Sequence, residues 1–204
     1  SQQSDHLRFA GVTGCVVWNG AVVLAKSLRH WVEDLGLSLQ GLRVLELGAG
    51  TGALALACAA LGAAVVATEQ EERLKLLRRN VERNAASGAG PWHVGRRGGS
   101  VDVEELDWFA ASPPPECDLV LATDVVYTEE VTVALVRRLA ALPAPAVVSV
   151  ELRTEEVHYA FVEALAAAPF AAHRLPEGAL ADGVRTRRVA TYVLVGPAAR
   201  ACCG

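Results

Sequence analysis

The chain has 204 residues, which is enough for one domain with its own hydrophobic core and too few for two ordinary domains. Apolar residues make up 52% of the chain and charged residues 21%, a balance typical of a folded globular protein and not of a disordered one. The net charge of −4 excludes a strongly basic nucleic-acid-binding surface, although local basic patches remain open.

The ends of the chain and its cysteines bear on the compartment. The longest apolar stretch, residues 52–67, is rich in alanine and interrupted by Gly62, so no membrane span is expected. The N-terminal residues lack the pattern of a signal peptide, and five irregularly spaced cysteines do not form a disulfide framework. These features predict an intracellular protein. We expect it in the cytoplasm, and the nucleus is the alternative compartment. Residues 1–204 are expected to form one domain. Residues 1–17 are expected to be an N-terminal segment whose preceding native residues are missing, and residues 197–204 a flexible tail.

Helical and strand patterns alternate along the chain. In chain order, we expect a helix over 18–35, a strand over 43–47, a helix over 53–61, a strand over 64–68, a helix marked by Leu74, Leu77, Val81 and Ala85, strands over 101–106 and 117–123, a helix over 129–142, a strand over 146–152, a helix over 154–167, and strands over 170–175 and 189–195. This alternation predicts an α/β fold with a mostly parallel, seven-stranded sheet and helices on both faces.

Unusual residues follow the first four strands of this sheet. A glycine run, residues 48–52, comes after the first strand, Glu69 ends the second, Asp107 and Trp108 follow the third, and Asp124 follows the fourth. Ligands of parallel α/β sheets bind beyond the carboxyl ends of the strands. The pattern therefore predicts one ligand site that gathers these residues at a single edge of the sheet.

The glycine run fits two kinds of nucleotide ligand. Residues 48–53 match the dinucleotide fingerprint G-x-G-x-x-A, and Glu69 lies about 20 residues on, where an acidic side chain binds ribose hydroxyls. A nicotinamide-dependent oxidoreductase is therefore one candidate. Glu46 argues against it, because a carboxylate just before the loop disfavours a pyrophosphate and suits a ligand with an ammonium group. The chain also lacks the Tyr-x-x-x-Lys pair of many hydride-transferring enzymes.

Together these segments resemble a known family. The run Glu46-Leu47-Gly48-Ala49-Gly50-Thr51-Gly52 resembles the first motif of class I, seven-β-strand S-adenosylmethionine-dependent methyltransferases. With Trp18, Leu106-Asp107-Trp108 and Asp124-Val125-Val126-Tyr127, the resemblance narrows to the protein-lysine methyltransferases of that fold, which include enzymes acting on valosin-containing protein, Hsp70 chaperones and elongation factors. It extends over residues 17–152. It implies a Rossmann-like class I methyltransferase sandwich, S-adenosylmethionine as cofactor, and methylation of a lysine on a non-histone protein.

The resemblance also implies a role for each matching residue. At the methionine end of the cofactor, Trp18 closes over it and Glu46 lies beneath its amino group. Gly48 and Gly50 approach the cofactor by their backbone, and the backbone of Thr123 lines the pocket. Glu69 accepts hydrogen bonds from the ribose hydroxyls, and Trp108 packs on the adenine. Asp124 and Tyr127 face the substrate amine as catalytic residues. Two positions depart from the family, which usually has Asp at the position of Glu69 and Ala at that of Thr123.

Each of these residues also has a simpler interpretation. Asp124 fits the N-cap of the helix that follows it, and the tryptophans fit an ordinary core. A non-catalytic cofactor-binding module is a second alternative to the enzyme. No His/Cys spacing resembles a metal site. We expect a monomer whose partner is a protein substrate. We expect it to bind neither nucleic acid nor a membrane. Of the arginine pairs, Arg96-Arg97 is a candidate contact for an acidic partner, and the pair at 137–138 is expected on a solvated face.

Overall fold

The computed structural model describes residues 16–86, 93–110 and 112–196. The helices are α2 (Asn19–Glu33), α3 (Ala53–Ala60), α4 (Glu71–Ala86), α5 (Glu129–Ala140), α6 (Glu155–Ala167) and the short 3₁₀ helix η2 (Glu177–Ala179). The strands are β1 (Arg43–Leu47), β2 (Ala64–Glu69), β3 (Ser100–Glu105), β4 (Leu119–Thr123), β5 (Ala146–Glu151), β6 (Ala171–Arg174) and β7 (Val189–Val195). The expected segment 1–17, apart from its last two residues, and the tail 197–204 lie outside the described residues.

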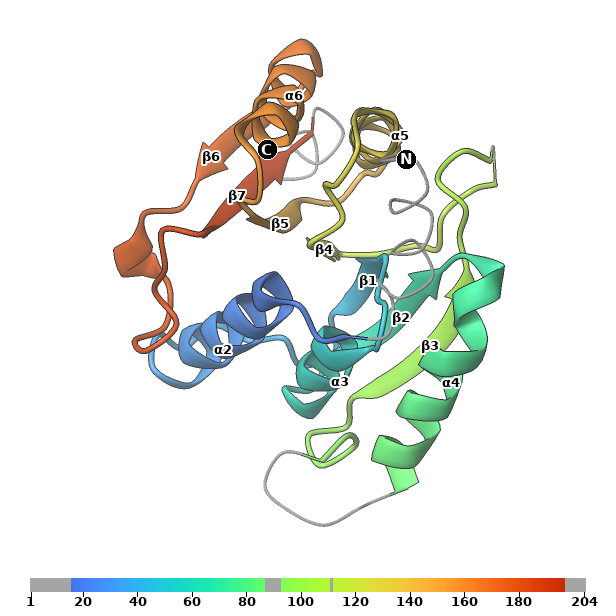
Figure 1. Ribbon diagram of the computed structural model, residues 1–204. Helices are drawn as coiled ribbons and strands as arrows, with labels where there is room; N and C mark the ends of the chain where they lie inside the picture. Colours follow the sequence, from blue (N-terminus) through green and yellow to red (C-terminus); the bar gives the residue numbers. More distant parts are fainter. Residues whose placement is uncertain (1–15, 87–92, 111, 197–204) are drawn as a thin grey trace.

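The seven strands form one sheet in the order β3-β2-β1-β4-β5-β7-β6, as Figure 1 shows. Strands β1 to β5 pair in parallel, whereas β7 runs antiparallel to both β5 and β6. The α/β fold with a mostly parallel, seven-stranded sheet is therefore confirmed. The chain winds outward from β1 in one direction through β2 and β3, and in the other through β4 and β5. The winding direction reverses between the neighbouring strands β1 and β4, and this switch point is where such sheets bind ligands.

Helices cover both faces of the sheet because successive strand residues point to opposite sides. Leu45 and Leu47 of β1 join a core cluster with Leu135 of α5 and Phe161 of α6. Val44 of the same strand joins the opposite cluster, whose helical members come from α2, α3 and α4. Figure 1 shows the same layers, with α5 and α6 on one side of the sheet and α2 and α3 on the other.

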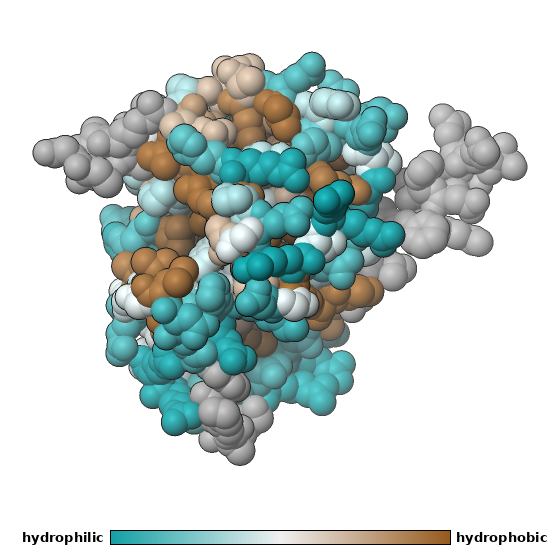
Figure 2. Space-filling model, turned by 90° about the vertical axis from the view of Figure 1, so that its left-hand side faces the viewer, coloured by the Kyte–Doolittle hydropathy of each residue, from teal (hydrophilic) through white to brown (hydrophobic). Residues whose placement is uncertain are grey.

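The surface carries its apolar residues in scattered positions. Figure 2 shows the face beside α6 and β6, where hydrophobic and hydrophilic residues intermingle without one continuous hydrophobic area. Tyr159 and Val162 of α6 are among the exposed apolar side chains. Within the described part of the chain, no helix has both the length and the apolar character needed to cross a membrane.

Candidate active site

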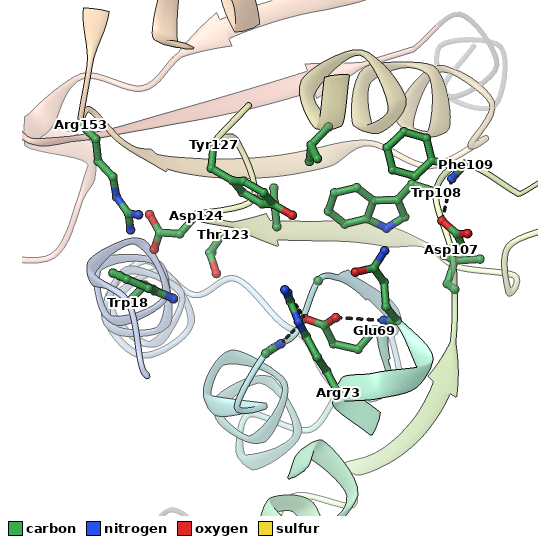
Figure 3. A pocket seen from close by; sticks show the side chains of 16 residues that line it. Trp18, Glu69, Arg73, Asp107, Trp108, Phe109, Thr123, Asp124, Tyr127 and Arg153 are labelled. Atoms are coloured by element: carbon green, nitrogen blue, oxygen red, sulfur yellow. Dashed lines mark hydrogen bonds and ion pairs between the residues drawn. The ribbon is translucent and has the colours of Figure 1, made fainter. Parts of the chain in front are cut away.

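A pocket opens at the carboxyl ends of the parallel strands, beside the switch point between β1 and β4. Eight of the nine residues predicted for the site line it: Trp18, Gly48, Gly50, Glu69, Trp108, Thr123, Asp124 and Tyr127. The hollow measures about 860 Å³ when the space at its solvent-open mouth is included. In Figure 3, Trp18 and Asp124 lie at one end, Trp108 and Phe109 at the other, and Glu69 and Tyr127 between them.

The glycine loop brings the backbone against the pocket wall. Gly48 has a φ of 70°, in the left-handed region that side chains other than glycine rarely adopt. A Cβ atom built there would lie 2.8 Å from Cγ1 of Val125 and 3.2 Å from Cζ2 of Trp108. Any larger residue at this position would push Val125 and the Trp108 ring outward. Glycine at 48 therefore sets the width of the pocket on the β1 side.

Glu69 ends β2 with a carboxylate that the backbone holds in place. Its Oε1 accepts a hydrogen bond of 3.1 Å from the N–H of Gly50, and its Oε2 accepts one of 2.9 Å from the N–H of Gln70. Arg73, one turn into α4, adds an ion pair of 3.9 Å to Oε1. Each carboxylate oxygen has two lone pairs, so both oxygens can accept further donors from a ligand. The arrangement suits a pair of ribose hydroxyls.

Glu46 lies apart from the residues that line the pocket. It alternates with Leu45 and Leu47 along β1, so its side chain points toward α3 and is 1% exposed. Burial raises the pKa of the Glu46 carboxyl to about 8, while a hydrogen bond from the backbone of Ala55 lowers it and the charge of Glu69 raises it. Oε2 of Glu46 has no hydrogen-bond partner in the structure. Glu46 is thus buried and is not among the residues that line the pocket, and its contact with a cofactor amino group stays a prediction.

Asp124 is held by two backbone donors from different elements. Its Oδ2 accepts a hydrogen bond of 2.7 Å from the N–H of Gly20 in α2, and its Oδ1 accepts one of 3.1 Å from the N–H of Glu151 in β5. Asp124 has a φ of 55° and is the single described residue other than glycine with a positive φ. Backbone strain of this kind concentrates at functional sites. Desolvation by burial raises the pKa of this carboxyl, and the two backbone hydrogen bonds lower it.

The capping interpretation of Asp124 named the wrong helix. The helix that follows, α5, is capped by Thr128, whose side chain accepts a hydrogen bond from the N–H of Val131. Asp124 instead binds the first turn of α2, whose own N-cap residue, Trp18, does not cap the helix with its side chain. Sequence separation concealed this contact, because Gly20 and Asp124 are 104 residues apart.

Trp18 lies in a small polar network at the same end of the pocket. The guanidinium of Arg153 lies 4.1 Å from the centre of the Trp18 ring, a cation–π contact. Arg153 also pairs with Glu151 at 3.1 Å, and Oε1 of Glu151 accepts a hydrogen bond of 2.8 Å from the side chain of Asn19. These contacts fix the ring at the start of α2, which makes Trp18 a wall of the pocket and not part of the hydrophobic core.

Trp108 lies at the opposite end, in the loop after β3. Its ring packs partly against the core cluster beneath α5 and α6, and its remaining surface lines the pocket. One ring thus belongs both to the core and to the pocket wall, and its contact with an adenine stays a prediction. Phe109 beside it is 54% exposed at the pocket edge.

Tyr127 points across the pocket and away from Asp124 (Figure 3). Burial raises the pKa of the Tyr127 hydroxyl, although 47% of the residue remains exposed, and the positive charge of Arg73 lowers it. Sequence reasoning missed Arg73 and Gln70 in this wall. Gln70 directly follows Glu69 and Arg73 lies in the first turn of α4, and their position beyond the carboxyl end of β2 was a usable signal.

One arginine that the sequence analysis expected to be exposed is buried. Arg138 was expected on a solvated face with Arg137, yet it is 8% exposed and donates to backbone carbonyls of the loop that carries Trp108. Arg137 is exposed, as expected. The described residues contain no group of three or more His, Cys, Asp or Glu side chains that could hold a metal ion.

Comparison with known proteins gives related sequences and related folds. A family described as lysine methyltransferase matches residues 6–167. Protein N-lysine methyltransferase METTL21A of Danio rerio is 40% identical over 127 residues, which are 61% of this chain and 53% of that protein. EEF1A lysine methyltransferase 3 of Xenopus tropicalis is 30% identical over 129 residues, 63% of this chain and 52% of that protein. The chain thus spans about half the length of the curated relatives it matches.

Solved structures share the fold at low sequence identity. Magnesium protoporphyrin IX methyltransferase (ChlM) from Synechocystis PCC 6803 with bound SAM superposes with a TM-score of 0.56 at 21% identity, covering 84% of this chain and 76% of that one. The glycopeptide N-methyltransferase MtfA superposes with a TM-score of 0.57 at 16% identity, covering 85% of this chain and 90% of that one. The Rossmann-like class I methyltransferase fold expected from the sequence is confirmed by these neighbours.

Proposed function

Because the chain belongs to the lysine methyltransferase family, we propose that it binds S-adenosylmethionine and methylates a lysine side chain of a non-histone protein. The observation that carries this proposal is the joint position of Glu69 and Trp108 in one pocket, next to Asp124 and Tyr127. A backbone-held carboxylate suits ribose hydroxyls, and an aromatic face suits an adenine ring. The nicotinamide alternative shares the ribose contact, but nothing in the family supports it.

The residues of the pocket fit a nucleoside with an amino-acid end. The Gly48 backbone forms a cradle that a Cβ atom would fill, and Glu69 keeps free lone pairs toward it. We assign Trp108 to the adenine, Glu69 to the ribose, Gly48, Gly50 and the backbone of Thr123 to the pocket wall, and Trp18 to the methionine end. Glu46 would act on the ligand amino group from below the loop. When bound, the cofactor would supply a methyl group on a sulfonium sulfur, and the neutral thioether S-adenosylhomocysteine would be the leaving group.

We assign Asp124 and the ring of Tyr127 to the acceptor side, although the Tyr127 hydroxyl points away from Asp124 (Figure 3). A free lysine has a pKa of ~10.4, about three units above neutral, so removing its proton at pH 7 costs about 4 kcal/mol. Desolvation in the pocket and a nearby positive charge lower that cost. We assign Asp124 to orienting the incoming ammonium through the lone pairs that its two backbone donors leave free. The Tyr127 ring would hold the amine by a cation–π contact.

The partner and compartment follow from the same proposal. A protein substrate is expected, and neither nucleic acid nor membrane is expected to bind. We further propose a monomer that acts in the cytoplasm, with the nucleus as a second compartment. The relatives differ in their named substrates, METTL21A being named only as a protein N-lysine methyltransferase and another relative as an EEF1A lysine methyltransferase.

The decisive test of the ligand is thermal unfolding with two nucleotides. S-adenosylhomocysteine at about 100 times its dissociation constant should stabilise the folded chain by ~2.7 kcal/mol, a rise in Tm of several degrees. NAD at the same concentration should give no comparable rise. Stabilisation by NAD but not by S-adenosylhomocysteine would refute the methyltransferase proposal.

A second experiment tests transfer itself. The chain is incubated with a cell extract and a cofactor that carries an isotope-labelled methyl group, and labelled peptides are identified by mass spectrometry. Label on lysine side chains of one or a few proteins would support the proposed methyl transfer to protein lysines. Strong cofactor binding without label on any protein would favour a non-catalytic cofactor-binding module.

A further inference from the structure

Arg138 of α5 donates hydrogen bonds to three backbone carbonyls of a single loop. Its Nη1 donates to the carbonyl of Ser112 at 2.6 Å. Its Nη2 donates to the carbonyls of Asp107 at 2.9 Å and Ala110 at 2.6 Å. The side chain is 8% exposed, so these bonds form away from bulk water. One guanidinium thus ties α5 to both sides of the segment that presents Trp108.

The ends of the loop are held by Leu106 and Cys117 in the core and by Arg43, which pairs with Glu116 and Asp118. Between these ends, the Trp108 ring packs on the core, and Arg138 supplies the hydrogen bonds that join the described residues of 107–115 to another element. No helix or strand runs between β3 and β4 in the part of that segment which the structure describes. Within the loop, Oδ1 of Asp107 accepts a hydrogen bond of 2.9 Å from the N–H of Phe109, and the N–H of Ala110 lies 3.3 Å from the carbonyl of Asp107. Both are local turn contacts, so neither joins the loop to the rest of the domain.

A buried guanidinium is costly, and its partners here are uncharged. Charge-assisted hydrogen bonds offset part of the desolvation, but an apolar side chain of similar volume often stabilises a protein as well. What an arginine adds is direction, because its planar fork fixes several acceptors at once. Here the fixed acceptors flank Trp108, whose ring lies against the Gly48 backbone on the pocket wall.

We propose that Arg138 is a positioning residue for cofactor binding, which holds the loop so that the Trp108 ring is already in place when the adenine arrives. The inference rests on the proposed function, because it takes the Trp108 side of the pocket as the adenine site. Arg138 touches no ligand in this account and acts only through Trp108. Its loss should therefore weaken binding and raise the KM for the cofactor, while kcat at saturating cofactor changes little.

Arg138→Lys tests this proposal, because lysine keeps the charge but cannot bind three carbonyls in a fixed plane. Arg137→Lys is the matched control, since Arg137 is adjacent in sequence and exposed. By calorimetry, S-adenosylhomocysteine should bind Arg138→Lys about fivefold to tenfold more weakly than wild type, part of what one stacked base contributes. Arg137→Lys should bind as wild type does. Equal affinity of the two variants would overturn the proposal even though the wild type binds the ligand.

A double-mutant cycle separates action through Trp108 from a general loss of structure. In a Trp108→Ala background, Arg138→Lys should cause little further loss of affinity, because the ring that it positions is gone. A full additional loss there would show that Arg138 acts elsewhere, and the proposal would fail. If Arg138→Lys does not fold, Arg138→Gln, which keeps two N–H donors, takes its place in the cycle.

Hydrogen exchange without ligand keeps this inference distinct from the proposed function. In the wild type, the amides of Phe109 and Ala110 should be protected to the same degree as those of α5, and Arg138→Lys should speed their exchange selectively. Free exchange of these amides in the folded wild type would overturn the role of Arg138. Failure of the wild type to bind S-adenosylhomocysteine would instead refute the cofactor assignment, whatever the exchange data show.

Discussion

The N–H of Gly20 donates a hydrogen bond of 2.7 Å to Oδ2 of Asp124, so the residue after β4 holds the first turn of α2. The approach is close enough to require glycine, because a Cβ atom at position 20 would lie 2.5 Å from that oxygen. Trp18, which begins the helix, is thereby fixed next to Asp124 at one end of the pocket. In the proposed enzyme, one carboxylate therefore serves both the cofactor wall and the acceptor side.

Gly20→Ala should destabilise the protein and displace Trp18. The added methyl group must move either the Asp124 carboxylate or the start of α2, and overpacking of this kind typically costs about 1–3 kcal/mol. Denaturant unfolding should show the loss, and cofactor affinity should fall with it. Gly178→Ala is the control, because a Cβ atom there meets nothing within 4 Å. Equal stability of the two variants would contradict the close contact.

Asp124→Asn should separate chemistry from folding. Asparagine tolerates the left-handed backbone at this position, whereas alanine does not. The amide has one oxygen for two backbone donors, so the free energy of unfolding should fall by about 1–3 kcal/mol. Methyl transfer per folded, cofactor-bound molecule should fall ~100-fold, since misplacing an acceptor by about 1 Å costs that much.

The comparison for Asp124→Asn is Tyr127→Phe, which keeps the ring facing the pocket and loses only the hydroxyl. It should retain more transfer activity than Asp124→Asn and more than Tyr127→Ala. Near-normal turnover of folded, cofactor-bound Asp124→Asn would leave Asp124 as a structural residue of α2 alone.

Glu69→Gln should weaken cofactor binding at least about tenfold, because a hydrogen bond to a charged group contributes roughly 1.5–3 kcal/mol. Glu71→Gln, two residues on in the exposed first turn of α4, is the matched control and should bind normally. Calorimetry with S-adenosylhomocysteine measures both. Unchanged affinity of Glu69→Gln would remove this residue from the ribose site.

Glu46 should make the protein less stable as the pH rises. Its folded pKa of about 8 exceeds the ordinary value of 4.5, so between these values the folded state keeps a proton that the unfolded chain has lost. The free energy of unfolding therefore falls as the pH rises through this window and levels off above pH 8. Glu46→Gln should flatten this part of the curve and be the more stable form at pH 8.5, as denaturant unfolding against pH would measure. If the curves of unfolding free energy against pH ran parallel for wild type and Glu46→Gln, they would contradict a raised pKa of Glu46.

The sequence by itself determined the sheet and the edge at which the site lies. Strand and helix patterns depend on local periodicity, so the expected strands over 43–47 and 189–195 coincide with β1 and β7, and the others differ only at their ends. Polar residues that end buried strands are visible without tertiary information, because a carboxylate beside a hydrocarbon run is costly unless it serves a site. Asp124 was identified on that ground and Glu69 by its place at the end of the second strand, about 20 residues after the glycine run, and both line the pocket.

Tertiary structure alone decided which partner each of these groups has. Asp124 binds a helix 104 residues away in place of the one that follows it, and Arg138 is buried although its neighbour Arg137 is exposed. The packing of α3 on the face of β1 that carries Glu46 buried this carboxyl away from the pocket wall. These outcomes depend on hydrogen-bond directions and close approaches between distant segments, which no periodicity along the chain encodes.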